Sequence, residues 1–151
     1  MIITLCGSNK YKKEIMMLKD ALRKLGFYVN PPAVFESDKE FTENEFYQIQ
    51  KGLLLGHFEK IKKSDVVIIC NFYGYTGNST TLELGYAKAC NKNIISIEHD
   101  CEMAKEILYD ITILRDNLQE RLNVHDNYCY TNDTIMNISD SIMFILDRMG
   151  N

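Results

Sequence analysis

The residue best suited to chemistry in this chain is a glutamate, Glu83, which follows a loop rich in glycine and asparagine. The loop comes after a strongly apolar stretch and leads into a segment of helical character. A carboxylate at the start of such a helix, at the mouth of a cleft, can act as a nucleophile or a general base. Thr80 and Glu83 also have the spacing of a capping box, and spacing alone favours this alternative.

Glu83 must be ionised if it is to act as a nucleophile. The amino end of a helix lowers the pKa of a nearby carboxyl group. Hydrogen bonds from Ser79 or Thr80, which precede Glu83 by about one helical turn, would lower that pKa further. We therefore expect a charged Glu83 side chain at neutral pH.

A second candidate loop runs from residue 6 to residue 13 and contains a glycine, two helix-capping residues and three lysines. Gly7 permits a tight turn, while Ser8 and Asn9 are good N-caps. Amides at a helix start bind phosphate, and the lysines would add positive charge. The alternative is a capped helix with a solvated basic first turn. The loop matches neither GxGxxG nor GxxxxGK[ST], so neither of those nucleotide-binding motifs is indicated.

Other residues with chemical potential have plainer interpretations. Tyr11 and Tyr75 flank the two loops and could stack on a planar ring of a ligand. His57 is interpreted as a structural surface histidine and Asp65 as a turn residue before a strand. The five cysteines include no CxxC pair and the three histidines are far apart, so spacing predicts no metal site. The cysteines are expected to be reduced thiols in a cytoplasmic protein.

The elements that position these residues alternate between two periods. Short apolar runs predict strands, and apolar residues at helical spacing predict helices. Strands are expected at 2–6, 27–29, 65–71, 94–97 and 127–131, and helices at 10–25, 43–63, 80–90 and 135–149, with an irregular helical stretch at 101–121. The consecutive apolar residues of 65–71 suit a central parallel strand that is covered on both faces.

This alternation predicts one α/β domain over residues 1–151, with a parallel sheet of about five strands and helices on both faces. Ligands of such sheets bind beyond the carboxyl ends of the strands, which selects the two loops described above. A net charge of −4 gives no reason to bind a nucleic acid polymer or an anionic membrane. No apolar run approaches the roughly 20 residues of a membrane span, and the first residues do not have the pattern of a signal peptide.

Several short motifs of the first two thirds of the chain form a familiar series. They are Leu5-Cys6-Gly7-Ser8, His57-Phe58-Glu59-Lys60-Ile61, Ser64-Asp65-Val66-Val67, Gly74-Tyr75-x-Gly77-x-Ser79-Thr80-x-x-Glu83-Leu84-Gly85-Tyr86-Ala87 and Lys92-x-Ile94. Over about residues 2–98, this series resembles the nucleoside 2-deoxyribosyltransferase-like family. The first loop is similar to that of the nucleotide N-glycosidase branch of the family, in which a Gly-Ser loop holds a 5′-phosphate.

The resemblance implies a flavodoxin-like (Rossmann-type) domain that cleaves or transfers the N-glycosidic bond of a (deoxy)nucleoside or nucleoside monophosphate. Glu83 would attack the anomeric carbon to give a covalent glycosyl-enzyme, and Ser79 and Thr80 would bind sugar hydroxyls and orient it. A homodimer is implied, without a metal or an organic cofactor. The substrate-binding residues are then Gly7, Ser8, Asn9, Tyr11, Tyr75, Gly77, Asn78, Ser79 and Thr80.

One departure from the family concerns the leaving base. Transferases of the family carry an acidic residue in the loop before the nucleophile helix, whereas residues 71–78 contain no carboxylate. Asn71 and Asn78 are the residues that could make similar contacts, and slow turnover is expected. A non-catalytic nucleotide-binding or sensing module on the same fold is the alternative function, since function resides in the site and not in the fold.

Overall fold

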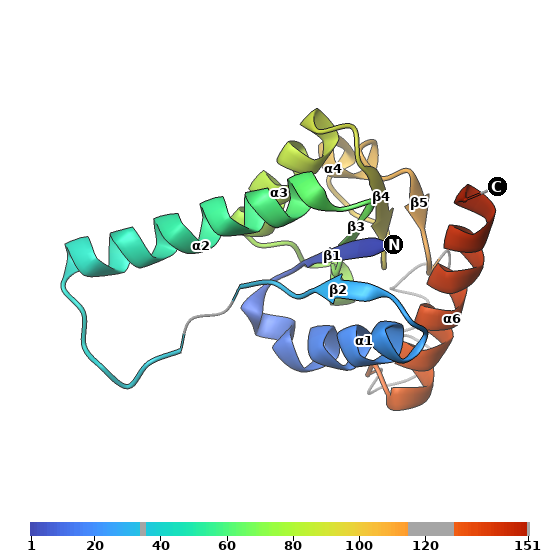
Figure 1. Ribbon diagram of the computed structural model, residues 1–151, viewed down its shortest axis with the longest axis horizontal. Helices are drawn as coiled ribbons and strands as arrows, with labels where there is room; N and C mark the ends of the chain where they lie inside the picture. The colour runs from blue at the N-terminus through green and yellow to red at the C-terminus, as the bar shows by residue number, and fades with distance from the viewer. Residues whose placement is uncertain (34–35, 115–128, 151) are drawn as a thin grey trace.

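The computed structural model describes residues 1–33, 36–114 and 129–150 and contains a parallel sheet between two layers of helices (Figure 1). The predicted α/β class is therefore confirmed. The strands are β1 (Ile2–Cys6), β2 (Tyr28–Asn30), β3 (Val66–Ile69), β4 (Asn93–Ser96) and β5 (Ile111–Thr112). The helices are α1 (Lys12–Lys24), α2 (Glu43–Lys63), α3 (Asn78–Ala89), α4 (Met103–Glu106) and α6 (Asn132–Met149), with 3-10 turns η1 (Asn9–Tyr11) and η2 (Phe72–Gly74).

The sheet has the order β2-β1-β3-β4-β5, so that β3 lies at its centre as predicted. The register pairs Cys6 with Ile69 and Ile69 with Ser96, which brings the carboxyl ends of β1, β3 and β4 to one edge. Strand order reverses between β1 and β3, because β1 is followed in sequence by β2 on its other side. The loops after β1 and β3 therefore flank the crevice in which such folds bind ligands.

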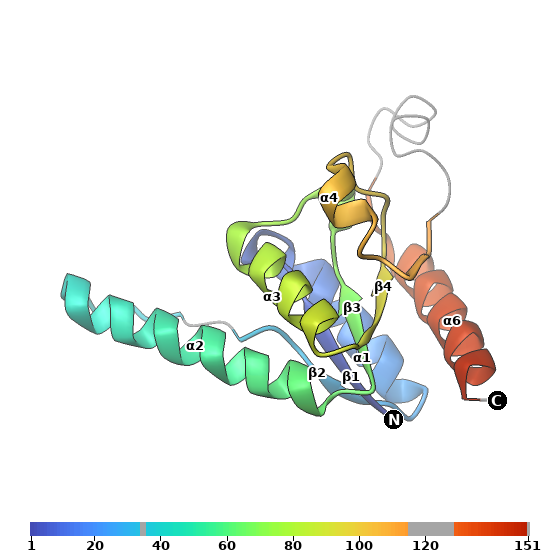
Figure 2. The same cartoon turned by 90° about the horizontal axis from the view of Figure 1, so that it is seen from above.

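Each face of the sheet is covered by a pair of helices (Figure 2). On one face, α1 and α6 contribute residues such as Leu18 and Ile138 to the larger apolar core, together with Leu5 of β1. On the other face, α2 and α3 contribute Ile61 and Leu84 to a smaller core. The alternating direction of side chains along each strand divides the sheet residues between the two cores.

Helix α2 has the predicted bounds but not the predicted packing. A capping box between Thr42 and Glu45 fixes its start. Of the expected inner face, Phe46, Ile49, Leu53, Phe58 and Ile61, the structure buries Ile61 alone, and Phe46 is 53% exposed. The amino-terminal half of α2 projects beyond the sheet (Figure 1). A periodic apolar stripe indicates a helix, but it does not say what the stripe packs against.

The fifth strand lies at a place that the sequence did not indicate. β5 forms within the stretch 101–121, which was predicted to be helical, and it pairs with β4 as an edge strand. Asp110 anchors it, because its carboxylate accepts a hydrogen bond from the backbone N–H of Ile94. A two-residue strand is too short to produce a periodic pattern. In the predicted strand 127–131, residues 127–128 lie outside the described residues, and 129–131 form no strand.

Two general expectations can be compared with the structure. Among the described residues, no helix combines the length and apolarity that crossing a membrane requires. All five cysteines are free thiols, and none is paired in a disulfide. Cytoplasmic localisation and a single domain over 1–151 stay predictions.

Candidate active site

Glu83 lies in the second turn of α3 and does not cap that helix. The helix begins at Asn78, and its N-cap is Gly77, which has no side chain with which to cap. The helix thus begins two residues before Thr80, its expected start, so Thr80 is already inside the helix and the capping-box alternative for Thr80 and Glu83 is wrong. The Glu83 side chain is buried beside Ser79 at the edge of a cavity.

Two adjoining hollows of about 290 and about 360 Å³ share Glu83 and Ser79 in their walls, and together we call them the Glu83 cleft. Both predicted loops reach it. Every predicted site residue lines the cleft except Tyr11 and Tyr75; those that do are Gly7, Ser8, Asn9, Gly77, Asn78, Ser79, Thr80 and Glu83. The crossover topology thus brings together residues that are about 70 positions apart in sequence.

The cleft also has a wall that the sequence analysis missed. It comes from the loop after β2 and from the middle of α2, and its members are Pro32, Ala33, Tyr47, Gln50, Lys51, Leu53, Leu54 and His57. His57 was interpreted as a surface histidine, but only 1% of it is exposed. The run of apolar and polar residues in α2 gave no signal of a cavity, because helical spacing does not distinguish a core from a pocket wall.

Two buried side chains contact the Glu83 region from other elements. The Cys6 sulfur, at the end of β1, lies 3.5 Å from Nε2 of His57. The same His57 nitrogen lies 3.9 Å from Oε2 of Glu83. The Nδ1 atom of His57 is buried without a hydrogen-bond partner among the described residues. Cys6, His57 and Glu83 therefore form a compact polar group at the floor of the cleft.

Burial controls the ionisation of this group. It raises the pKa of Glu83 to about 7, against a smaller lowering by a hydrogen bond with Cys6. Burial lowers the pKa of His57 to about 4, and the charge of Lys60 acts in the same direction. Burial also raises the pKa of the Cys6 thiol, as does the nearby Glu83. At neutral pH the imidazole is uncharged, so its contact with Glu83 is not an ion pair.

The expectation of a lowered pKa for Glu83 is therefore wrong. The amino end of α3 and the hydroxyl groups near it do stabilise a carboxylate, but the dipole effect fades within the first turn. Glu83 lies in the second turn, where removal from water disfavours the charged form more strongly. A substantial part of the Glu83 side chains is therefore protonated near neutral pH.

The first loop packs tightly against the sheet. A Cβ atom on Gly7 would lie 2.7 Å from Cδ1 of Ile15 and 3.0 Å from Cβ of Cys70, so a larger residue there would force these neighbours to shift. Ser8 caps the 3-10 turn η1, because its hydroxyl accepts a hydrogen bond from the backbone N–H of Lys10. The predicted helix start at residue 10 is thus a 3-10 turn, and α1 begins at Lys12.

Tyr11 and Tyr75 meet each other beside the cleft, not inside it. Their ring centres are 6.1 Å apart in an edge-on arrangement, and Tyr11 also contacts Tyr73. The ammonium group of Lys10 lies 4.8 Å from the centre of the Tyr75 ring. The Tyr75 hydroxyl lies 3.8 Å from the position that a Cβ on Gly77 would occupy, so this cluster borders the start of α3.

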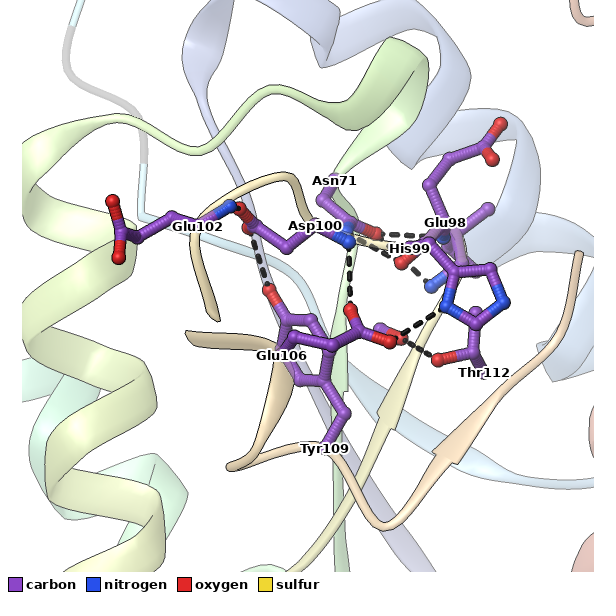
Figure 3. Close-up of polar contacts among 10 residues, drawn as sticks. Asn71, Glu98, His99, Asp100, Glu102, Glu106, Tyr109 and Thr112 are labelled. Carbon is purple, nitrogen blue, oxygen red and sulfur yellow. Dashed lines mark hydrogen bonds and ion pairs between the residues drawn. The ribbon is translucent and has the colours of Figure 1, made fainter. Parts of the chain in front are cut away.

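Asn71 is not placed to contact a leaving base. It is fully buried, and its Oδ1 accepts hydrogen bonds from the backbone N–H groups of Ile97 and Glu98, while its Nδ2 donates to the carbonyl of Glu98 (Figure 3). The side chain thereby ties the end of β3 to the end of β4. Of the two asparagines that the sequence suggested, Asn78 is the one that lines the cleft.

The acidic residues after β4 hold their own loop in place. Glu106 accepts a hydrogen bond from the backbone N–H of Asp100 and contacts Nδ1 of His99, and the Tyr109 hydroxyl donates to Asp100 (Figure 3). Lys105 reaches across to the hydroxyl of Thr76, 2.6 Å away. Among the described residues, Glu83 is the one carboxylate that lines the Glu83 cleft.

Comparison with known proteins gives matches among solved structures. No protein family matches the sequence, and no curated protein matches it either. A 2-deoxyribosyltransferase from Bacillus psychrosaccharolyticus has 17% sequence identity and a TM-score of 0.53, over 89% of this chain and 96% of that chain. A CMP N-glycosidase of Clostridium botulinum has 18% identity and a TM-score of 0.49, over 85% of this chain and 100% of that chain.

A third structure, a conserved protein from Enterococcus faecalis, has 14% identity and a TM-score of 0.49, over 93% of this chain and 98% of that chain. At these identities a match concerns the fold and not the activity. The match with the Bacillus protein extends over nearly the whole of both chains. In its fold, therefore, this chain is similar to a 2-deoxyribosyltransferase, as the sequence motifs led us to expect.

Proposed function

We propose that this protein cleaves or transfers the N-glycosidic bond of a (deoxy)nucleoside or nucleoside monophosphate, with Glu83 as the nucleophile. The observation that carries the proposal is the position of the Glu83 carboxylate, which lies at the wall of an open cleft beside Ser79 and is not used to cap its helix. The fold shared with the Bacillus 2-deoxyribosyltransferase supports the same class of chemistry.

In the proposed first step, an oxygen of Glu83 bonds to the anomeric carbon of the sugar while the bond from that carbon to the base nitrogen breaks. The electron pair of the broken bond leaves with the base, which takes up a proton. The transition state resembles an oxocarbenium ion, and the product is a glycosyl ester of Glu83. In the second step, water or another base attacks the anomeric carbon, and the bond to Glu83 breaks with its electron pair returning to the carboxylate. The attacking group loses a proton to solvent, which balances the proton that the first base took up from solvent.

The cleft residues supply binding and orientation in this proposal. Ser79 and Thr80 hold sugar hydroxyls and the Glu83 carboxylate, while the backbone amides of Gly7, Ser8 and Asn9 hold the 5′ end of the sugar. All of them line the same hollow. Asn78 is the polar side chain of the second loop that can contact the base. A site that fixes the sugar at both ends holds the anomeric carbon against the nucleophile.

The test is incubation with a panel of deoxynucleosides and their monophosphates, with and without an acceptor base, followed by chromatography for free base. A substrate analogue with fluorine at the sugar 2-position should stall the second step, and mass spectrometry should then find the sugar on the peptide that contains Glu83. Tight ligand binding without any base release would favour the nucleotide-binding module. A label on another residue would exclude Glu83 as the nucleophile.

We also propose the homodimer that the resemblance implies. It is supported by the projecting half of α2, on which Phe46 and Tyr47 are each more than 50% exposed. A helix with so little packing is marginal in water on its own. Sedimentation analysis of Phe46→Glu should detect monomer. Phe144→Glu, on α6 and equally exposed at 54%, is the matched control and should stay dimeric.

A further inference from the structure

Three side chains of the types that bind transition metals meet at the floor of the Glu83 cleft. They come from β1, α2 and α3, and each is buried. The sulfur of Cys6, a ring nitrogen of His57 and a carboxylate oxygen of Glu83 all lie within 4.8 Å of one another. Their separation in sequence hid this group, because it has none of the short spacings by which metal sites are recognised.

The distances suit a tetrahedral ion. With a metal–sulfur bond of about 2.3 Å and a metal–nitrogen bond of about 2.0 Å, tetrahedral geometry places the two ligand atoms about 3.5 Å apart. Cys6 Sγ and His57 Nε2 are 3.5 Å apart. His57 Nε2 and Glu83 Oε2 are 3.9 Å apart, so a small rotation of the Glu83 side chain brings its oxygen into position.

The charges also balance. A Cys6 thiolate and a Glu83 carboxylate carry two negative charges, and the His57 imidazole is neutral. A divalent cation bound to all three therefore forms a complex without net charge, which avoids the large cost of an unpaired charge in a buried site. Because Glu83 lines the open cleft, an ion has a path to the group. Three protein ligands leave a fourth position for water.

We propose that Cys6, His57 and Glu83 bind a divalent transition-metal ion of the zinc type, and that the bound ion blocks the nucleophile. Binding displaces the thiol proton of Cys6, and any proton on Glu83, to solvent. While the carboxylate is a metal ligand, its electron pair is not available to attack the anomeric carbon. The proposed metal site depends on geometry alone. Inhibition of the Glu83 nucleophile by the bound ion depends also on the proposed function.

Cobalt tests the metal site without any need for turnover. Metal-free protein titrated with Co²⁺ should develop the near-ultraviolet absorption of a thiolate–cobalt bond and the visible bands of a four-coordinate ion, and Zn²⁺ should abolish both. Cys6→Ala should remove the thiolate band. His57→Gln should weaken Zn²⁺ binding by at least about 100-fold, since even changes next to ligands cost about 10–100-fold.

Cys70→Ala is the matched control. Cys70 is a second fully buried cysteine beside the end of a central strand, and it is not a member of the group. It should keep the thiolate band, and circular dichroism should confirm that each variant is folded. Absence of the band in the wild-type protein, or its persistence in Cys6→Ala, would overturn the site.

The block is tested separately by base release. Zn²⁺ at one equivalent should lower the rate at least about ten-fold, and a chelator should restore it, since each ion removes one nucleophile. If the cobalt bands form and the rate does not change, the block is wrong and the metal site stands. If no base release is found under any condition, the proposed function fails, and the cobalt spectra still decide whether the metal binds.

Discussion

On one face of the sheet, α1 and α6 cover a large core of apolar side chains, whereas on the other α2 and α3 cover a smaller core that adjoins buried polar groups. The first face includes residues such as Leu18, Leu22 and Ile142, none of which is exposed. The second face adjoins His57 and Glu83, and its helix α2 extends past the sheet (Figure 1).

The difference shows how the molecule separates stability from chemistry. Apolar burial is the main stabilising contribution on the α1–α6 face, where the buried carboxylate of Glu98 accepts a hydrogen bond from the hydroxyl of Tyr130, a member of that core. The α2–α3 face removes a carboxyl and an imidazole from water, and both pKa values shift toward the uncharged form as a result. Groups with shifted pKa values in a cleft are typical of functional sites. Variants that change one face at a time test this difference between the two faces.

The largest effect is expected from Glu83→Gln. It removes the nucleophile while keeping the size of the side chain, so base release should fall by at least about 1,000-fold. The free energy of unfolding should change little below about pH 4.5, because the uncharged amide resembles the protonated carboxyl, and it should rise near pH 7, where ionisation of Glu83 destabilises the wild-type fold. Rates of base release at saturating substrate check the prediction. Glu59→Gln, which changes an exposed carboxylate on α2, is the control and should keep the wild-type rate.

How much of this face was predictable differs from residue to residue. The strand that became β3 was recognised because its apolar residues are consecutive, and the crossover rule then placed both loops at one edge. Glu83 could be selected from its position after β3. Its burial and its raised pKa could not, because they depend on how α2 closes the cleft.

The contact between Cys6 and His57 was beyond sequence reasoning for a related cause. The two residues are 51 positions apart, and which side of α2 faces β1 is set by tertiary packing. The same limit explains the exposed Phe46, which helical spacing placed in the core. β5 was missed because two residues give no period. Local patterns thus predicted the elements, and long-range packing decided the environment of the site.

The second prediction compares a core residue of one face with an exposed residue of the other. Leu18→Ala on α1 should lower the free energy of unfolding by about 3 kcal/mol, because it leaves a cavity in a fully buried site. Phe46→Ala, in the projecting half of α2, should cost less than about 1 kcal/mol in the monomer. Urea unfolding at low protein concentration measures both. Equal losses would mean that the projecting half of α2 is packed after all.

The third prediction concerns pH. Glu83 has a folded pKa of about 7, above its ordinary 4.5, so it stabilises the fold at low pH, and this contribution of about 3 kcal/mol is lost as pH rises through 7. His57 has a folded pKa of about 4, below its ordinary 6.5, so its contribution is lost as pH falls from 6.5 toward 4. The two effects oppose each other in the wild-type protein.

Variants separate the two effects. Between pH 4.5 and 6.5, the free energy of unfolding of Glu83→Gln should fall as pH falls, whereas that of His57→Gln should rise. The base-release parameter kcat/KM should increase by about ten-fold per pH unit below 7 and level off above it, because only ionised Glu83 is a nucleophile. A flat rate profile from pH 5 to 7 would contradict the assignment of Glu83 to the pKa of about 7.

The smallest effect is expected at the first loop, where the phosphate of a monophosphate substrate would bind. Lys10 extends over the Tyr75 ring, and Ser8 lies in the wall of the cleft. An exposed charge contributes about 0.2–1 kcal/mol and a hydroxyl hydrogen bond about 0.5 kcal/mol or more, so Ser8→Ala combined with Lys10→Ala should raise KM for a monophosphate by about five-fold. KM for the matching nucleoside should change by less than about two-fold, because no phosphate is present to lose a contact.

Lys13→Ala removes an exposed lysine of the same segment and should leave both values unchanged. Because Ser8 caps η1, the melting temperature of the double variant must also be measured. If KM rose equally for the monophosphate and the nucleoside, the substitutions would have distorted the loop, and the loop would not recognise the phosphate.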